Sequence, residues 1–110
     1  MSEDLVTFDE FKRMDLRVAQ IVGVQDHPNA DKLYVIQIDI GGETRQTVAG
    51  LKGYYTPEEL MGKRVAAIVN LAPAVLRGER SEGMILAAQR GDTVTLLVPE
   101  ADVPPGSKVL

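Results

Sequence analysis

Over residues 33–40, large apolar side chains recur at every second position, and this alternation sets the strongest limit on how the chain can fold. Side chains two positions apart in a strand lie on one face, so the segment predicts a strand with a single buried face. Gly41 and Gly42 follow at once and supply the positive φ angles of a tight hairpin, which returns through residues 44–49. The face that we expect in the core carries Tyr34, Ile36, Ile38 and Ile40.

Further strand signals lie on both sides of this hairpin. Residues 16–24 predict a strand buried on much of both faces, and Gly23 permits a bulge or bend in it. Its faces carry Leu16, Val18 and Val22 on one side and Arg17, Ala19 and Ile21 on the other. Later strands are predicted at residues 64–69, 83–88 and 94–98, with a turn at residues 90–92.

Capping signals predict two short helices. Thr7 followed three residues later by Glu10 is a capping-box pattern, so a helix is expected to begin at Phe8 and to bury Phe8 and Phe11 on its inner face. Residues 56–62 combine a threonine N-cap, a proline at the first helical position, acidic residues in the first turn and a final glycine. These patterns predict helices of one to two turns.

The length of 110 residues favours one domain with a modest core. Within it, residues 1–14 form the N-terminal helical segment, and residues 99–110, with three prolines, predict an extended tail. The absence of cysteine excludes disulfides, thiolate metal sites and a cysteine nucleophile. No long apolar run and no signal-peptide pattern occur, so we expect no membrane span and a cytoplasmic location.

The net charge of −4 is unusual for a nucleic-acid-binding protein. Six of the 16 acidic residues but only one of the 12 basic residues lie in residues 1–10 and 100–110, so residues 11–99 hold 10 acidic and 11 basic side chains. The middle of the chain is therefore close to neutral. This allows a local basic groove and excludes a broad basic face.

Residues 70–84 read NLAPAVLRGERSEGM and form a connection far longer than a hairpin loop needs. Together with MDLRV at residues 14–18 and HPNADKLY at residues 27–34, they resemble the tRNA-binding domain family. That family includes the C-terminal or β-subunit domain of methionyl-tRNA synthetases, free-standing structure-specific tRNA-binding proteins and the endothelial monocyte-activating polypeptide II group. The resemblance runs from about Phe8 to the C-terminus.

The order of three strands, a short helix and two or three more strands is typical of an OB-fold, although SH3-like barrels also have five short strands. The resemblance implies the OB-fold. We therefore predict an all-β, five-stranded OB-fold barrel with short helices and an extended tail. The resemblance also implies a homodimer held partly by the N-terminal helix and the proline-rich tail.

The resemblance implies a tRNA-contacting surface at Asn70, Arg77, Ser81 and Met84. Arginine side chains hold phosphate through forked donors, asparagine and serine offer hydrogen bonds, and methionine can pack on a base. We add Arg80 from the same stretch, and Lys32 and Lys52 from elsewhere. Relatives often carry lysine at Ala72 and Ala74, so phosphate neutralisation here falls to Lys32, Lys52, Lys63 and Arg45 if their strands bring them together.

Catalysis is poorly supported. His27 is the only histidine and has no second histidine or cysteine with which to form a metal site or a nucleophile pair, so we expect a structural or solvent-facing role. No cofactor is expected. For base stacking the candidates are Tyr54 and Tyr55, because Tyr34 falls on the core side of its strand.

The sequence thus predicts a non-catalytic module that increases tRNA affinity, with methionyl-tRNA synthetase as a partner. The alternative is a peptide-binding protein that resembles the secretion chaperones of the same fold, which the acidic pI and the two missing lysines favour. A third reading is an adaptor that docks onto a synthetase without RNA. Met1 and the acidic lead-in favour a free-standing protein over a domain cut from a synthetase.

Overall fold

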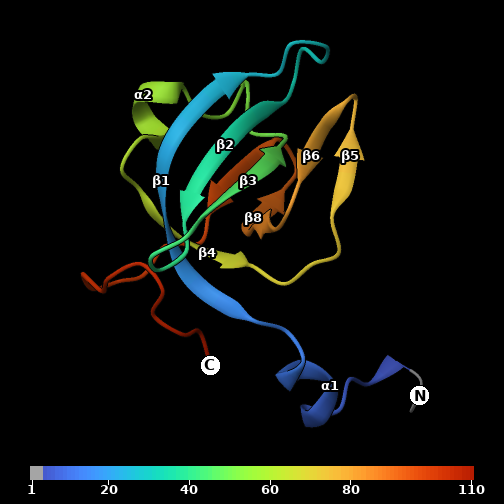
Figure 1. The fold of residues 1–110 in the computed structure, drawn as a ribbon, viewed down its shortest axis with the longest axis vertical. Helices are drawn as coiled ribbons and strands as arrows, with labels where there is room; N and C mark the ends of the chain where they lie inside the picture. Colours follow the sequence, from blue (N-terminus) through green and yellow to red (C-terminus); the bar gives the residue numbers. More distant parts are fainter. Residues whose placement is uncertain (1–3) are drawn as a thin grey trace.

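The computed structural model describes residues 4–110 as a small β-barrel with appended ends (Figure 1). Strands account for most of the regular structure. In chain order the elements are α1 (Phe8–Lys12), β1 (Leu16–Asp26), β2 (Tyr34–Asp39), β3 (Thr44–Ala49), α2 (Pro57–Leu60), β4 (Arg64–Ile68), β5 (Ala74–Leu76), β6 (Glu79–Ser81), β7 (Met84–Ile85), β8 (Ala87–Arg90) and β9 (Thr93–Leu96).

The central sheet has the strand order β3-β2-β1-β4-β7, and every neighbouring pair is antiparallel. β3 also packs against β6 and β7, so the five strands curl into a nearly closed barrel. The β1–β2 register shifts between Ile21 and Gly23, where the predicted bulge lies. A bulge bends and twists its strand, which allows β1 to pair with β2 and β4 along one curved path. The predicted OB-fold barrel is confirmed.

The barrel interior is filled mainly by branched aliphatic side chains from the sheet. Ile36 and Ile38 are fully buried, as the alternation of residues 33–40 predicted, and each contributes about 1.5–3 kcal/mol of hydrophobic free energy. Val35, on the opposite face, is also buried, whereas Val22 is 45% exposed at the bulge. The core cluster comprises Ala19, Ile21, Tyr34, Ile36, Ile38, Ile40, Leu51, Leu60, Val65, Ala67, Val69, Ile85 and Leu96.

Both predicted helices form and both carry complete capping boxes. Thr7 caps α1 and Thr56 caps α2, each accepting a hydrogen bond from the backbone N–H of a glutamate three residues on. Each glutamate carboxylate accepts a bond back from the N-cap backbone, which lowers its pKa. α2 places Leu60 in the barrel, whereas α1 buries none of its residues.

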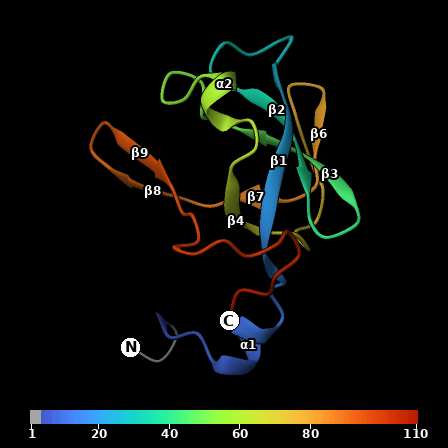
Figure 2. The same ribbon diagram turned by 90° about the vertical axis from the view of Figure 1, so that its left-hand side faces the viewer.

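The prediction for Phe8 and Phe11 was wrong within this chain. Phe8 is 72% exposed and Phe11 is 36% exposed, because α1 extends away from the barrel instead of packing on it (Figure 2). The pattern correctly identified an apolar helix face, and nothing in the described chain covers that face fully. The C-terminus lies beside α1 in the same view.

The second half of the chain differs from the prediction in its strand boundaries. The strand predicted at residues 83–88 divides into β7 and β8 at Leu86, whose N–H donates to Ala66 O and whose carbonyl accepts from Leu97 N. β8 then leaves the barrel and pairs with β9 as a separate hairpin (Figure 2). The long connection at residues 70–84 also contains a hairpin of its own, β5–β6, which the sequence analysis did not predict.

The tail is extended, as expected, and it runs along the first half of β1. Val18 exchanges backbone hydrogen bonds with the tail, accepting from Gly106 N at 2.7 Å and donating to Ser107 O at 2.8 Å. The Cα atoms of Gly41 and Gly106 approach so closely that a Cβ on either would meet the other at 2.8–2.9 Å. Neither helix within residues 4–110 is long and apolar enough to cross a membrane.

Candidate nucleic-acid interface

The loop between β1 and β2 is closed by His27. His27 is 5% exposed, its Nδ1 accepts a hydrogen bond from the Asn29 N–H at 2.9 Å, and its Nε2 lies 2.8 Å from Leu76 O. Since a carbonyl oxygen only accepts, Nε2 carries the proton and donates it. The ring therefore joins the β1–β2 loop to β5, so of the structural and solvent-facing roles considered for His27 the structure shows the structural one.

The β5–β6 hairpin turns at Arg77 and Gly78. Their φ angles are +53° and +92°, as in a two-residue type I′ turn, and the strands pair Leu76 with Glu79 across it. A non-glycine residue in this region carries a strain of about 1–2 kcal/mol. The Arg77 side chain is exposed. The backbone carbonyl of Arg77 accepts a 3.4 Å hydrogen bond from the side-chain amide of Asn29. The hairpin tip and the β1–β2 loop are therefore one connected unit.

Ser81 fixes the root of this hairpin to the barrel. It is 7% exposed, and its Oγ accepts from Val48 N at 3.0 Å and donates to Gly83 O at 3.2 Å. A second link is the Gln46 amide, which donates to Arg80 O at 2.9 Å. The Ser81 hydroxyl is thus engaged within the protein and acts by positioning β6 against β3.

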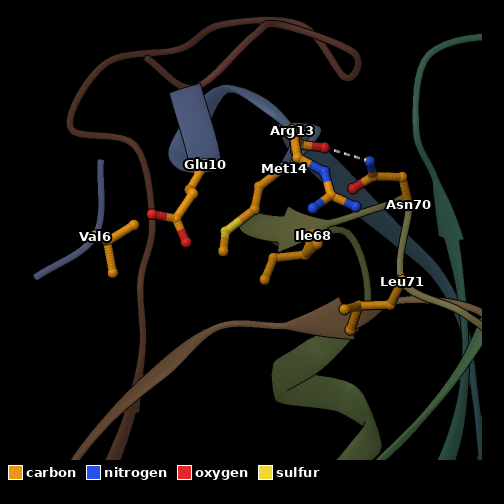
Figure 3. A pocket seen from close by; sticks show the side chains of 7 residues that line it. All are labelled: Val6, Glu10, Arg13, Met14, Ile68, Asn70 and Leu71. Atoms are coloured by element: carbon orange, nitrogen blue, oxygen red, sulfur yellow. Dashed lines mark hydrogen bonds between the residues drawn. The ribbon is translucent and has the colours of Figure 1, made fainter. Parts of the chain in front are cut away.

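Asn70 has a similar role at the other end of the connection. Its Oδ1 accepts from Asp15 N at 2.8 Å. Its Nδ2 donates to Arg13 O at 2.7 Å, the bond drawn in Figure 3. The side chain therefore holds the start of β1 against the end of β4. It borders a hollow of about 400 Å³ that lies between α1 and the barrel.

Met84 is open to solvent at the start of β7. It is 52% exposed and borders a hollow of about 240 Å³ whose other walls include Val48 and Leu51. An exposed, flexible thioether next to a hollow can pack against a flat aromatic ligand such as a nucleobase. Of the four residues that the family resemblance implied as tRNA contacts, Arg77 and Met84 therefore present free side chains.

The structure brings four of the predicted basic residues to one region. Lys32 lies in the β1–β2 loop, Arg77 and Arg80 lie on the β5–β6 hairpin, and Lys52 pairs with Asp26 at the end of β1 at 3.3 Å. Arg80 pairs with Glu82, also at 3.3 Å. Among residues 4–110, neither Arg77 nor Lys32 takes part in an ion pair.

Acidic residues balance this group: Asp26 ends β1, Asp31 lies in the β1–β2 loop, Glu79 begins β6 and Glu82 follows β6. The region is therefore mixed in charge and has only a few free cations. Arg45, which we considered as compensation for the missing lysines, is half-buried and donates to Val69 O while pairing with Glu43. Lys63 lies near Tyr55 and α2 and does not join the group.

The tyrosines contribute one exposed ring. Tyr34 is buried, as predicted, and its hydroxyl donates to Tyr55 O at 2.8 Å. The Tyr55 hydroxyl oxygen accepts from Leu96 N at 3.1 Å, and this bond lowers the pKa of the phenol. Tyr54 is 46% exposed and remains available for stacking. Residues 4–110 contain no group of three or more metal-ligating side chains.

Comparison with known proteins identifies the class to which this arrangement belongs. The model of a family described as "Putative tRNA binding domain" matches residues 16–108. Among curated proteins, the chain is 57% identical over 104 residues to methionine–tRNA ligase of Pyrococcus furiosus, covering 94% of this chain and 14% of that enzyme. The chain therefore spans about one seventh of the length of that relative.

Two solved structures share the whole fold. A MetRS-related protein from Pyrococcus horikoshii superposes with a TM-score of 0.89 at 33% identity, covering 96% of this chain and 98% of that one. The CsaA chaperone protein from Picrophilus torridus gives a TM-score of 0.89 at 32% identity, covering 96% and 100%. From the extent of the family match and the identity to its relatives, the chain belongs to the tRNA-binding domain family.

Proposed function

We propose that this chain is a non-catalytic module that binds tRNA through the β1–β2 loop and the β5–β6 hairpin. The observation that carries the proposal is the pair of hydrogen bonds by which His27 and Asn29 join these two loops. In OB-folds the ligand face lies between the loops that follow strands 1 and 4, which are these two loops here. Four basic side chains surround them, and two of those are free of acidic partners in the described chain.

Recognition would depend on RNA shape and backbone more than on base identity. Few free cations and one exposed tyrosine predict modest affinity for a single site. A dimer that presents two such faces would raise the apparent affinity by avidity. In this role the module increases the tRNA affinity of a synthetase with which it associates, and methionyl-tRNA synthetase is the candidate because of the 57% identity.

The surface for a homodimer is the apolar face left open by α1 and the tail. Val6 is 68% exposed, Phe8 is 72% exposed and Leu110 is 95% exposed, and Phe8, Phe11 and Leu110 line one hollow of about 210 Å³. Such exposure is costly in water unless a partner covers it. Sedimentation velocity should give a dimer for the wild type and a monomer for Phe8→Glu, whose side chain lies outside the barrel core.

The binding test is a titration of bulk tRNA over a salt series with the wild type, an Arg77→Ala, Arg80→Ala variant and an Arg90→Ala control. Arg90 is exposed on the separate β8–β9 hairpin. Loss of two phosphate contacts should weaken binding and flatten the plot of log affinity against log salt by about 1.4–1.8 units, with no change for the control. Failure of the wild type to bind at low salt would reject the proposal.

The second candidate is peptide binding, which the balanced charge of the interface and the similarity to the CsaA chaperone protein favour. The hollow beside Met84 is mainly apolar and would suit a hydrophobic side chain. Adding an unfolded reporter polypeptide to the same titration tests this candidate. The polypeptide should compete with tRNA only if both bind to this face. Co-purification with a synthetase after nuclease treatment would instead support an adaptor.

A further inference from the structure

A row of amide side chains crosses the outer face of the barrel from β6 to β2. Gln46 donates from Nε2 to Arg80 O at 2.9 Å, and its Oε1 accepts from Gln37 Nε2 at 2.9 Å. Gln37 and Gln46 are register partners on β2 and β3. Since the Arg80 carbonyl only accepts, it fixes the orientation of the Gln46 amide, which in turn fixes that of Gln37.

The last group in the row is the Gln37 Oε1 oxygen. It has no hydrogen-bond partner within residues 4–110, and no buried side-chain oxygen or nitrogen in those residues lacks one. The oxygen therefore reaches solvent. The row holds it as a hydrogen-bond acceptor with a fixed direction, so a ligand that donates to it pays little entropy for ordering the side chain.

The side chain of Gln37 also lines a hollow. Its volume is about 340 Å³, within the roughly 300–1,000 Å³ typical of small-ligand pockets. Gly23 at the β1 bulge keeps it open, because a Cβ there would lie 3.3 Å from Gln37 Cγ. The lining has no charged side chain and consists of Gly23, Val24, Gln25, Val35, Gln37 and Met61.

This lining suits a flat, neutral group that donates a hydrogen bond. Val24 and Val35 offer apolar walls, and Met61, 49% exposed, offers a thioether that can pack on an aromatic face. A phosphate would find no cation there. A nucleotide base meets all three conditions, because it has flat apolar faces, no charge and N–H donors at its edge, and the ribose attached to it adds the 2′-hydroxyl as a further donor.

The amide row connects the hollow to the proposed tRNA interface. β1, β2, β3 and β6 follow one another across the molecule in Figure 1, and the amide row links Gln37 to the backbone of Arg80. Only the Gln46 side-chain amide stands between Gln37 Nε2 and Arg80 O. A phosphate at Arg80 and a base in the hollow can therefore belong to one short stretch of unpaired RNA.

We propose that this hollow receives one unpaired nucleotide of the bound tRNA and that Gln37 Oε1 accepts a hydrogen bond from it. The inference rests on the proposed tRNA-binding function. It assigns the recognition of a base or a 2′-hydroxyl to Gln37, whereas Arg77 and Arg80 hold phosphates. The two kinds of contact differ in their salt dependence, because only phosphate contacts release counterions.

The test compares Gln37→Met with wild type in tRNA titrations over a salt series, with Gln89→Met on the exposed β8 strand as control. Methionine matches glutamine in length and removes the acceptor. Gln37→Met should weaken binding by about two- to twelvefold, the range for one neutral hydrogen bond, with an unchanged salt slope. Gln89→Met should bind as the wild type does. Thermal unfolding of each variant confirms that the barrel is intact.

A second arm uses a tRNA transcript and a DNA strand of the same sequence. If Gln37→Met weakens both, the donor is on the base; if it weakens only the RNA complex, the donor is the 2′-hydroxyl, and either result supports the proposal. Wild-type affinity in Gln37→Met, or a flatter salt slope, would overturn it while leaving tRNA binding intact. If the wild type itself fails to bind tRNA, the proposed function and this inference both fail.

Discussion

Replacing His27 with asparagine should loosen the β5–β6 hairpin while leaving the turn after β1 in place. The asparagine Oδ1 can occupy the position of Nδ1 and accept from the Asn29 N–H, as in an Asx turn. The shorter side chain cannot reach Leu76 O, which His27 Nε2 contacts at 2.8 Å. The substitution therefore removes one of the two hydrogen bonds between the loops, leaves the bond from Asn29 to Arg77 O, and retains the turn.

The expected size follows from one neutral hydrogen bond. Leu76 is 40% exposed, so water can replace the lost donor, and the net cost is about 0.5–1.5 kcal/mol instead of the larger cost of a buried unpaired group. β5 has no buried residue, and the contacts that remain are the Asn29 bond to Arg77 O at the tip and the Gln46 and Ser81 bonds on β6. The opening equilibrium of the hairpin should rise by about two- to twelvefold.

Amide hydrogen exchange followed by NMR measures that equilibrium directly. Amides of β5 and β6 should exchange about two- to twelvefold faster in His27→Asn, with β2 and β3 unchanged. His27→Gln is the matched control, because its Nε2 can still reach Leu76 O while the acceptor for Asn29 is lost. Equal exchange of the hairpin in both variants, or no change in either, would refute the role assigned to His27.

Other predictions concern stability. Hydrogen bonds from Arg17 lower the pKa of Asp15, so the ionised carboxylate stabilises the fold above its ordinary pKa of 3.8 and this stabilisation is lost as the pH falls below that value. Asp15→Asn should therefore lower the melting temperature at pH 7, and the variant and the wild type should converge in acid. Gly106→Ala, with φ of +93° and Gly41 Cα 2.9 Å from the new Cβ, should cost at least about 1 kcal/mol in urea unfolding. Thr56→Ala removes an N-cap and should cost about 0.5–2 kcal/mol in the same assay.

Local patterns accounted for most of the barrel. The alternation of residues 33–40, the two glycines after it and the Thr56 capping box act through neighbours in sequence, and all formed as predicted. The β5–β6 hairpin was missed because Arg77, at φ +53°, occupies a turn position that usually signals itself with asparagine, aspartate or glycine. A helix pattern likewise shows which face of α1 is apolar and cannot show whether the barrel covers it.

The contacts of the site were harder to predict from the sequence than the barrel, because they join residues that lie far apart along the chain. Asn70 bonds to a residue 55 positions away and Ser81 to one 33 positions away, so their engagement with backbone groups follows only from the fold. The same applies to His27 and Leu76, 49 positions apart. The proximity of the β1–β2 loop to the β5–β6 hairpin could have been suggested by OB-fold topology, which places both at one end of the barrel.

Hydrogen exchange by mass spectrometry, with and without saturating bulk tRNA, tests the central claim most directly. The account predicts slower exchange in peptides covering the β1–β2 loop and the β5–β6 hairpin, and no change in the β8–β9 hairpin. No protection anywhere, or protection confined to α1 and the tail, would contradict it.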